Sequence, residues 1–291
     1  MKLRRTMLFM PGNNPGMIQN APILGADSII LDLEDAVSLD EKDAARLLVK
    51  NALETLDFTG CEVVVRINSI KSDFGYDDLN VIARVKPDAI LVPKATEEDI
   101  EEIDEILSTI EREEKFKLGS IKLIPLVETA LGLENIRETI LASKRNIAVL
   151  LGAEDLTADM GIKRTREGNE IFYARSKVAS VCRAFKIDAI DTPFADVNDI
   201  EGLIEDTKRA KAIGMTGKAA INPRQIDYIH DVFSPTMEEI MYAKRVLHAK
   251  EEALREGKGV FSLDGKMVDA PVIQRAENII MKAKLAGIIR E

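Results

Sequence analysis

The sequence contains no tryptophan, and aromatic residues make up only 4% of its 291 residues. Proteins that bind single-stranded nucleic acid stack bases on aromatic side chains, so this scarcity argues against such a role. Positive charge is also outweighed, because 40 Lys and Arg face 50 Asp and Glu, for a net charge of −10. An acidic chain exerts no general attraction on nucleic acid or on an anionic membrane surface, and we expect neither as a partner.

Cysteine and histidine are equally scarce. The two cysteines, Cys61 and Cys182, fit neither a disulfide framework nor a CxxC metal site, and they indicate buried thiols in a reducing cytosol. His230 and His248 lie outside the predicted strand ends, and no Ser-His-Asp or phosphate-loop pattern is present. No apolar run approaches the roughly 20 residues of a membrane span. We therefore expect a cytoplasmic protein without a dedicated nucleophile.

The most prominent pattern in the sequence is an alternation of short apolar runs with longer segments of helical period. Continuous apolar runs are typical of strands buried on both faces, and their alternation with helices predicts a parallel sheet. Eight such units predict an α/β fold, a closed (β/α)₈ barrel. An open doubly wound sheet is the alternative, but the first turn lacks GxGxxG. The predicted strands are 6–10, 28–33, 62–67, 89–92, 121–127, 147–151, 188–191 and 218–221, and the helices include 40–56, 97–115, 131–144, 170–186 and 198–213.

The last part of the chain departs from this alternation. We expect a barrel domain over 1–233 and a C-terminal helical extension over 234–291 that acts as a lid or an oligomer contact. The extension contains predicted helices at 236–256 and 272–286. Between them, Asp264-Gly265 is typical of a β-hairpin turn.

Active sites of such barrels lie where the strands end, so polar residues at those positions are candidates. Glu128 and Asp155 follow neighbouring predicted strands, and no Cys or His accompanies them. This pattern disfavours zinc and favours Mg²⁺, which is commonly held by one or two carboxylates together with water and substrate oxygens. The alternative is that each carboxylate caps the helix that follows it.

Further acids and one arginine follow the second and third predicted strands. Asp32 and Asp35, with Glu34 between them, could contact a metal through water or cap the next helix. Arg66 ends an otherwise apolar strand and offers a forked donor to a carboxylate or carbonyl. Its alternative role is an ion pair with the acids of the second strand.

Three more basic residues are candidates for holding an anionic substrate. Arg4 and Arg5 precede the first strand and could bind phosphate or carboxylate, or remain solvated. Lys94 follows the fourth strand and is a charge partner or, less in keeping with the surrounding acids, a Schiff-base lysine. A divalent cation, an arginine and acids together suit carbon–carbon bond chemistry on a carboxylate substrate.

Five segments resemble the citrate lyase β-subunit group of the HpcH/HpaI aldolase superfamily, and the resemblance covers nearly the whole chain. They are RTMLFMPGN at 5–13, DLEDAV at 32–37, VRINS at 65–69, PLVETA at 125–130 and GAEDL at 152–156. The resemblance implies a TIM barrel. It also implies a retro-Claisen lyase that splits a citryl thioester, on an acyl carrier protein or on CoA, into oxaloacetate and an acetyl thioester.

The resemblance also assigns roles to residues. Glu128 and Asp155 would hold Mg²⁺, and Arg66 would bind the substrate. Independently of the resemblance, we expect Arg66 and Glu128 to act on the substrate and the charges of Arg5 and Lys94 to help bind it. Asp269, within VDAP at 268–271, would be an acid or base, in its own or a neighbouring subunit; alternatively it caps the last helix. The implied partners are the citrate lyase α and γ subunits and further copies of the chain.

Three other functions remain open from the sequence. A malyl-CoA or citramalyl-CoA lyase would use the same site on a different thioester. A catalytically silent barrel could act as a scaffold for a carrier protein. An aldolase acting on free pyruvate adducts would need no thioester at all.

Overall fold

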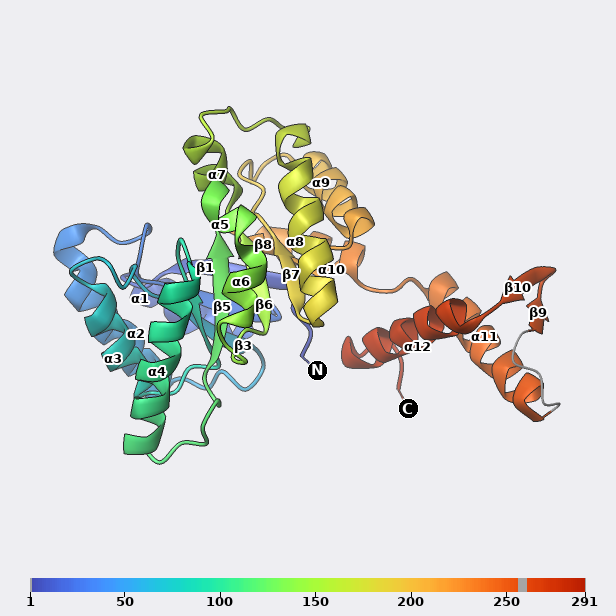
Figure 1. Cartoon of the computed structure of the whole chain (residues 1–291), viewed down its shortest axis with the longest axis horizontal. Coiled ribbons are helices and arrows are strands. Elements are labelled where there is room, and N and C mark those ends of the chain that lie inside the picture. Colours follow the sequence, from blue (N-terminus) through green and yellow to red (C-terminus); the bar gives the residue numbers. More distant parts are fainter. Residues whose placement is uncertain (1, 256–260, 291) are drawn as a thin grey trace. The chain divides into compact units, whose positions relative to one another are not determined.

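The computed structural model describes residues 2–255 and 261–290, and it contains two compact units, Arg4–His230 and a second made mainly of Asp231–Glu291. In the first unit eight parallel strands close into a barrel in the order β1 to β8 (Figure 1). The predicted (β/α)₈ barrel is confirmed. The strands are β1 Thr6–Pro11, β2 Ser28–Asp32, β3 Glu62–Arg66, β4 Ala89–Val92, β5 Lys122–Val127, β6 Ala148–Leu151, β7 Asp188–Asp191 and β8 Gly217–Ala220.

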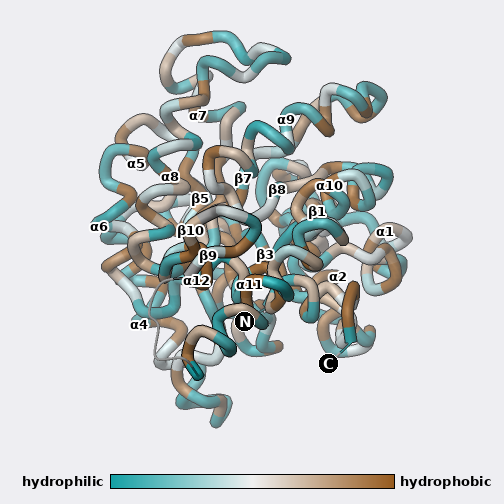
Figure 2. Tube along the Cα trace, turned by 90° about the vertical axis from the view of Figure 1, so that its right-hand side faces the viewer, coloured by the Kyte–Doolittle hydropathy of each residue, from teal (hydrophilic) through white to brown (hydrophobic). Residues whose placement is uncertain are grey.

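Helices connect these strands and alternate hydrophobic and hydrophilic positions along their length (Figure 2). The helix expected over 131–144 is interrupted at Asn135, whose φ of −95° and ψ of 15° end one helix and begin the next. The helices are α1 Pro15–Asn20, α2 Lys42–Thr55, α3 Gly75–Ala83, α4 Glu97–Glu113, α5 Ala130–Glu134, α6 Ile136–Leu141, α7 Ala153–Asp159, α8 Phe172–Phe185, α9 Ile200–Ile213 and α10 Ile226–Phe233.

Two apolar layers explain why the strands read as continuous hydrophobic runs. Alternate side chains from all eight strands, among them Met7, Ile30 and Ile124, form one buried cluster that fills the barrel. The intervening side chains, such as Val149, pack outward against helices, where Cys182 is buried. Most strands are therefore apolar on both faces with polar residues near their ends, whereas β8 carries the fully buried Lys218 within the strand. Neither cysteine forms a disulfide, as predicted; Cys182 is buried as expected, whereas Cys61 is only partly buried.

The second unit contains α11 Met237–Arg255, a hairpin of β9 Phe261–Leu263 and β10 Lys266–Val268, and α12 Ala270–Leu285. The predicted Asp264-Gly265 turn is present, and both residues have positive φ, 52° and 75°. A small core that includes Ala243, Val268 and Ala276 holds the unit together. No helix in the described residues is long and apolar enough to cross a membrane.

Candidate active site

The carboxyl ends of β2 to β6 bring six of the predicted site residues to one mouth of the barrel. Asp32 ends β2, and Asp35 follows in the next loop. Strand pairing places Asp32 directly beside Arg66 at the end of β3. Lys94, Glu128 and Asp155 follow β4, β5 and β6. Parallel strands in a closed barrel end at the same rim, so these residues share one site although up to 123 positions separate them in the sequence.

Arg66 is held by the acids of the β2–α2 loop. Its Nε and NH2 donate to the two carboxylate oxygens of Asp32 at 2.7 and 2.6 Å, and its NH1 donates to Asp35 at 3.0 Å. Burial lowers the pKa of Arg66, but the hydrogen bonds and charge of Asp32 and the neighbouring acids outweigh it, and the pKa lies above its ordinary value. The ion pair considered as an alternative role for Arg66 is therefore present, and it fixes the guanidinium in place.

The β2–α2 loop is itself held rigidly. Asp32 accepts backbone hydrogen bonds from Glu34 at 2.9 Å and Ala36 at 3.2 Å, so it shapes this loop instead of capping the next helix. The buried Lys42 ammonium donates to the carbonyl oxygens of Leu33 and Glu34 at 2.8 and 2.6 Å. The backbone that carries the acids is therefore held by hydrogen bonds to both Asp32 and Lys42.

Glu34 belongs to the site more closely than the sequence reasoning recognised. Its Oε2 lies 3.0 Å from Arg66 NH1, without hydrogen-bond alignment, and its Oε1 lies 3.7 Å from Lys94 Nζ. Burial raises the pKa of Glu34 to about 7, against the lowering effect of Arg66. A sequence signal for this existed, because Glu34 lies between Asp32 and Asp35 in one acidic loop after β2.

Glu128 is buried, with only 2% of its surface exposed. Burial, followed by the charge of Glu34 and the proximity of Asp155, raises its pKa to about 8. The Lys94 backbone N–H donates to its Oε1 at 2.8 Å. A Cβ at Gly152 would lie 2.7 Å from Glu128 Cβ and 2.9 Å from Oε2, so glycine at this position leaves room for the carboxylate.

Neither carboxylate is an N-cap. Thr129 caps α5 by accepting a hydrogen bond from Gly132, so the capping alternative is wrong for Glu128. Asp155 lies in the first turn of α7, whose N-cap residue is Gly152 without a side-chain cap. Two interacting carboxyl groups, one buried with a strongly raised pKa, form a site that a divalent cation would stabilise.

The donor set fits magnesium better than a metal that needs a protein cage. The described residues contain no group of three or more His, Cys, Asp or Glu side chains able to hold a metal. Mg²⁺ does not require one, since one or two carboxylates with water and substrate oxygens suffice. Glu128 and Asp155 are the residues that would hold it, and Gly152 keeps space beside Glu128 Oε2.

Two predicted residues lie elsewhere. Arg5 precedes β1, at the opposite end of the barrel from Glu128, where it pairs with Asp27 at 2.8 Å. The structure does not bring Arg5 to the site, because the amino and carboxyl ends of parallel strands form opposite mouths. Asp269 lies in the second unit and caps α12, with its Oδ1 accepting from Val272 N at 3.3 Å. The helix-cap role considered for it is confirmed.

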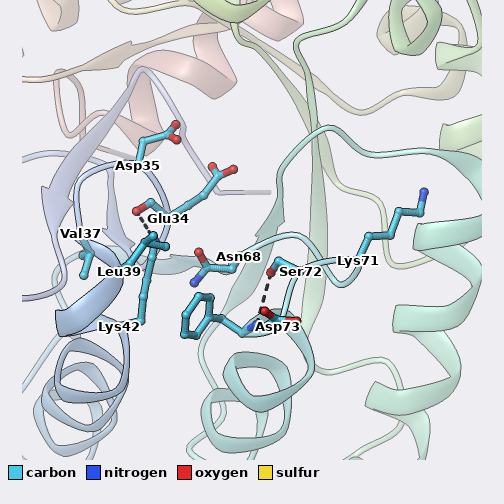
Figure 3. Close-up of a pocket in the computed structure, with 10 residues that line it drawn as sticks. Glu34, Asp35, Val37, Leu39, Lys42, Asn68, Lys71, Ser72 and Asp73 are labelled. Carbon is cyan, nitrogen blue, oxygen red and sulfur yellow. Dashed lines mark hydrogen bonds between the residues drawn. The ribbon is translucent and has the colours of Figure 1, made fainter.

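A cavity of about 540 Å³ lies between the loops that follow β2 and β3 (Figure 3). Its lining includes Glu34 and Asp35, so it adjoins the acids that contact Arg66. In Figure 3 the Lys71 side chain extends away from these acids, and it pairs with Asp99 of α4 at 2.9 Å. The site therefore has open space on the side of β2 and β3.

A parallel eight-stranded barrel that places a carboxylate pair, one member of it buried, beside an arginine at its mouth is typical of a metal-dependent carbon–carbon lyase. The chain belongs to the HpcH/HpaI aldolase/citrate lyase family, whose model matches residues 5–223.

Named relatives extend over the whole chain. "Citrate lyase subunit beta" of Haemophilus influenzae is 42% identical over 292 residues and covers 100% of both chains. The protein of the same name from Leuconostoc mesenteroides is 44% identical over 289 residues, 99% of this chain and 96% of that one. Among solved structures, protein CitE from Mycobacterium tuberculosis, in complex with magnesium, acetoacetate and coenzyme A, is 30% identical with a TM-score of 0.79. It matches over 97% of this chain and 98% of that chain.

Proposed function

We propose that this protein is the β subunit of a citrate lyase, a Mg²⁺-dependent enzyme that cleaves a citryl thioester into oxaloacetate and an acetyl thioester. The observation that supports this most strongly is the placement of the Glu128–Asp155 pair at the same barrel mouth as Arg66. The names of the relatives that are 42 and 44% identical support the citryl substrate.

The reaction is a retro-Claisen cleavage that needs no covalent enzyme intermediate. A base removes the proton of the citryl tertiary hydroxyl, and the carbon–carbon bond breaks as that oxygen becomes the keto group of oxaloacetate. The bonding electron pair passes to the thioester fragment as an enolate, which takes a proton at carbon to give the acetyl thioester. When bound, magnesium supplies Lewis-acid polarisation of the hydroxyl and keto oxygens.

The residues of this chain position the substrate and the charge. Arg66 binds a substrate carboxylate or the developing oxyanion through the donors that Asp32 and Asp35 leave available, and Asp32 prevents the guanidinium from turning away. Lys94, half exposed at the mouth, contributes a second positive charge for the dicarboxylate. Removing one such preorganised donor typically costs about 2.7–4 kcal/mol of transition-state stabilisation.

One acid, Asp269, donates a proton in this proposal, and two others support the site. Asp35 and Asp32 hold the arginine and any water beside the cation, while Asp269 donates the proton to the acetyl enolate. Asp269→Asn tests the proposed role of Asp269 as an acid. Asparagine keeps the oxygen that caps α12 but cannot donate the proton. Loss of turnover with unchanged stability supports a chemical role, and unchanged turnover leaves only the cap.

The partners follow from the same function. We propose that the thioester arrives on an acyl carrier protein or CoA, that citrate lyase α and γ subunits assemble with this chain, and that several copies associate. Cys61 and Cys182 form no disulfide, which is compatible with the cytoplasm as the site of this assembly.

One assay separates this function from its alternatives. The full-length protein is incubated with Mg²⁺ and citryl-CoA, malyl-CoA or citramalyl-CoA, and the released keto acid is quantified. We expect oxaloacetate from citryl-CoA. Cleavage of the other two thioesters alone would identify a malyl- or citramalyl-CoA lyase instead. Release of pyruvate from an adduct without any thioester would support the aldolase, and no cleavage of any substrate would support the scaffold.

A further inference from the structure

Lys94 has a backbone conformation that is unusual for its place in the fold. Its φ is +46°, in the left-handed region that lysine rarely adopts. Among the described residues four other non-glycine positions share this property, Lys86, Lys115, Lys186 and Asp264. Those four lie just after helices or in the hairpin turn, where left-handed residues are common. Lys94 instead follows a barrel strand, directly at the candidate site.

This conformation turns the Lys94 amide toward the next strand. Its N–H donates to Glu128 Oε1 at 2.8 Å, and the following amide, of Ala95, donates to the carbonyl of Leu126 on β5 at 3.4 Å. One oxygen of the buried Glu128 carboxylate is thereby fixed by backbone, while Gly152 leaves space beside the other. A rotation of the Lys94 peptide would leave this carboxylate without that donor.

The side chain explains why the position is not glycine, which would adopt the same conformation without cost. Lys94 Nζ lies 3.7 Å from Glu34 Oε1, and Glu34 Oε2 lies 3.0 Å from Arg66 NH1. Lys94 therefore contacts the Glu128 carboxylate, the proposed metal ligand, through its backbone N–H. Through its ammonium group it contacts Glu34, which lies beside Arg66. Backbone strain of this kind persists only where the surrounding structure enforces it.

We propose that Lys94 is a positioning residue whose left-handed backbone orients Glu128 for the divalent cation. This inference rests on the proposed role of Glu128 as a metal ligand. It assigns to the Lys94 peptide a function that is separate from any contact of the ammonium group with substrate. The two functions are separable because a substitution can remove the ammonium group while either keeping or disfavouring positive φ.

The test compares three variants of the full-length protein, K94G, K94N and K94V. All remove the ammonium group, but glycine and asparagine tolerate the left-handed region and β-branched valine does not. Mg²⁺ binding is measured by isothermal titration calorimetry, with melting temperature as a folding control. We expect K94G and K94N to bind Mg²⁺ nearly as the wild type does, and K94V to bind about 10–100-fold more weakly, as when a ligand loses its orienting partner.

Equal Mg²⁺ affinity in K94V and K94N, whether unchanged or weakened in both, would overturn the assignment. If K94V does not fold, K94A replaces it, because alanine also disfavours positive φ, and the same ordering against K94G is expected. E128Q separates the role of Lys94 from the proposed metal site. Weakened binding in E128Q with wild-type binding in K94V overturns only the role of Lys94, whereas wild-type binding in E128Q overturns the proposed metal site with it.

Discussion

Arg66 and Asp32 form a two-point ion pair across neighbouring strands, with Nε–Oδ1 and NH2–Oδ2 distances of 2.7 and 2.6 Å. The pair joins residues that are hydrogen-bonded neighbours in the β2–β3 ladder. Asp32 therefore sets the plane of the guanidinium before any substrate arrives. Preorganisation of this kind is the main contribution a protein makes when the reaction has no covalent intermediate.

The first prediction concerns this geometry. Arg66→Lys keeps the charge but loses the fork that meets both oxygens of Asp32. We expect kcat/KM for the citryl thioester to fall about 10²–10³-fold, the range for losing one preorganised donor. Arg84→Lys is the matched control, because Arg84 lies on the surface and pairs with Glu113 and Glu114. Equal activity of both variants would show that the fork of Arg66 has no role in turnover.

The second prediction concerns the space beside Glu128. Gly152→Ala would place a methyl group 2.7 Å from Glu128 Cβ, so the carboxylate or the β6 end must shift. Overpacking of this kind costs about 1–3 kcal/mol of stability. Displacement of the Glu128 carboxylate should also weaken Mg²⁺ binding. Denaturant unfolding and calorimetry measure the two effects. Gly60→Ala is the control, since its nearest heavy atom would be 3.8 Å away. Wild-type behaviour of Gly152→Ala would contradict the close contact.

The third prediction concerns pH. Without metal, the pKa of Glu128 is raised to about 8 by burial, so the carboxyl group is mostly protonated at neutral pH. The folded state then binds more protons than the unfolded state, and the stability of the metal-free protein falls as pH rises from the ordinary pKa toward 8.

Magnesium binding reverses this effect, since it requires the ionised carboxylate. The apparent affinity for Mg²⁺ should rise by roughly tenfold per pH unit below 8 and level off above it. Calorimetry in buffers of different ionisation enthalpy should show proton release on binding at pH 7. Binding without proton release would contradict a buried, protonated Glu128.

The fourth prediction concerns stability away from the site. Lys218 is fully buried and contacts Asp191 at 2.5 Å and Asp206 at 2.7 Å. Burial tends to raise the pKa of Asp206, but the charges of Lys218 and Arg175 lower it overall, so this contribution to stability is present at neutral pH and is lost in acid.

Lys218→Met removes one partner from this network, and we expect a loss of about 3–5 kcal/mol at pH 7 that becomes smaller as pH falls. The exposed Lys208 on α9 provides the control, Lys208→Met, with little expected change. Chemical unfolding at several pH values measures both variants. A loss that is independent of pH would contradict the electrostatic explanation.

The sequence was sufficient to predict all eight strands, because short apolar runs alternate with segments of helical period, although β7 and β8 also carry the buried charges of Asp191 and Lys218. It also located Glu128, Asp155 and Arg66, since charge directly after such a run marks the barrel mouth. Asn135, which divides α5 from α6, was missed because no glycine or proline marks the break. The left-handed φ of Lys94 was also missed, because lysine gives no signal for it. The structural role of Arg5 could not be predicted from its charge alone, since its partner Asp27 directly precedes a different strand, β2.

Whether Glu128 and Asp155 hold the cation is decided by titrating Mg²⁺, in the presence of oxaloacetate, into the wild type, Glu128→Gln, Asp155→Asn and the surface control Glu134→Gln. We expect the first two substitutions to weaken binding at least about tenfold, because each turns a carboxylate ligand into a neutral amide, and Glu134→Gln to bind as the wild type does. Equal Mg²⁺ affinity in all four proteins would show that neither carboxylate holds the metal.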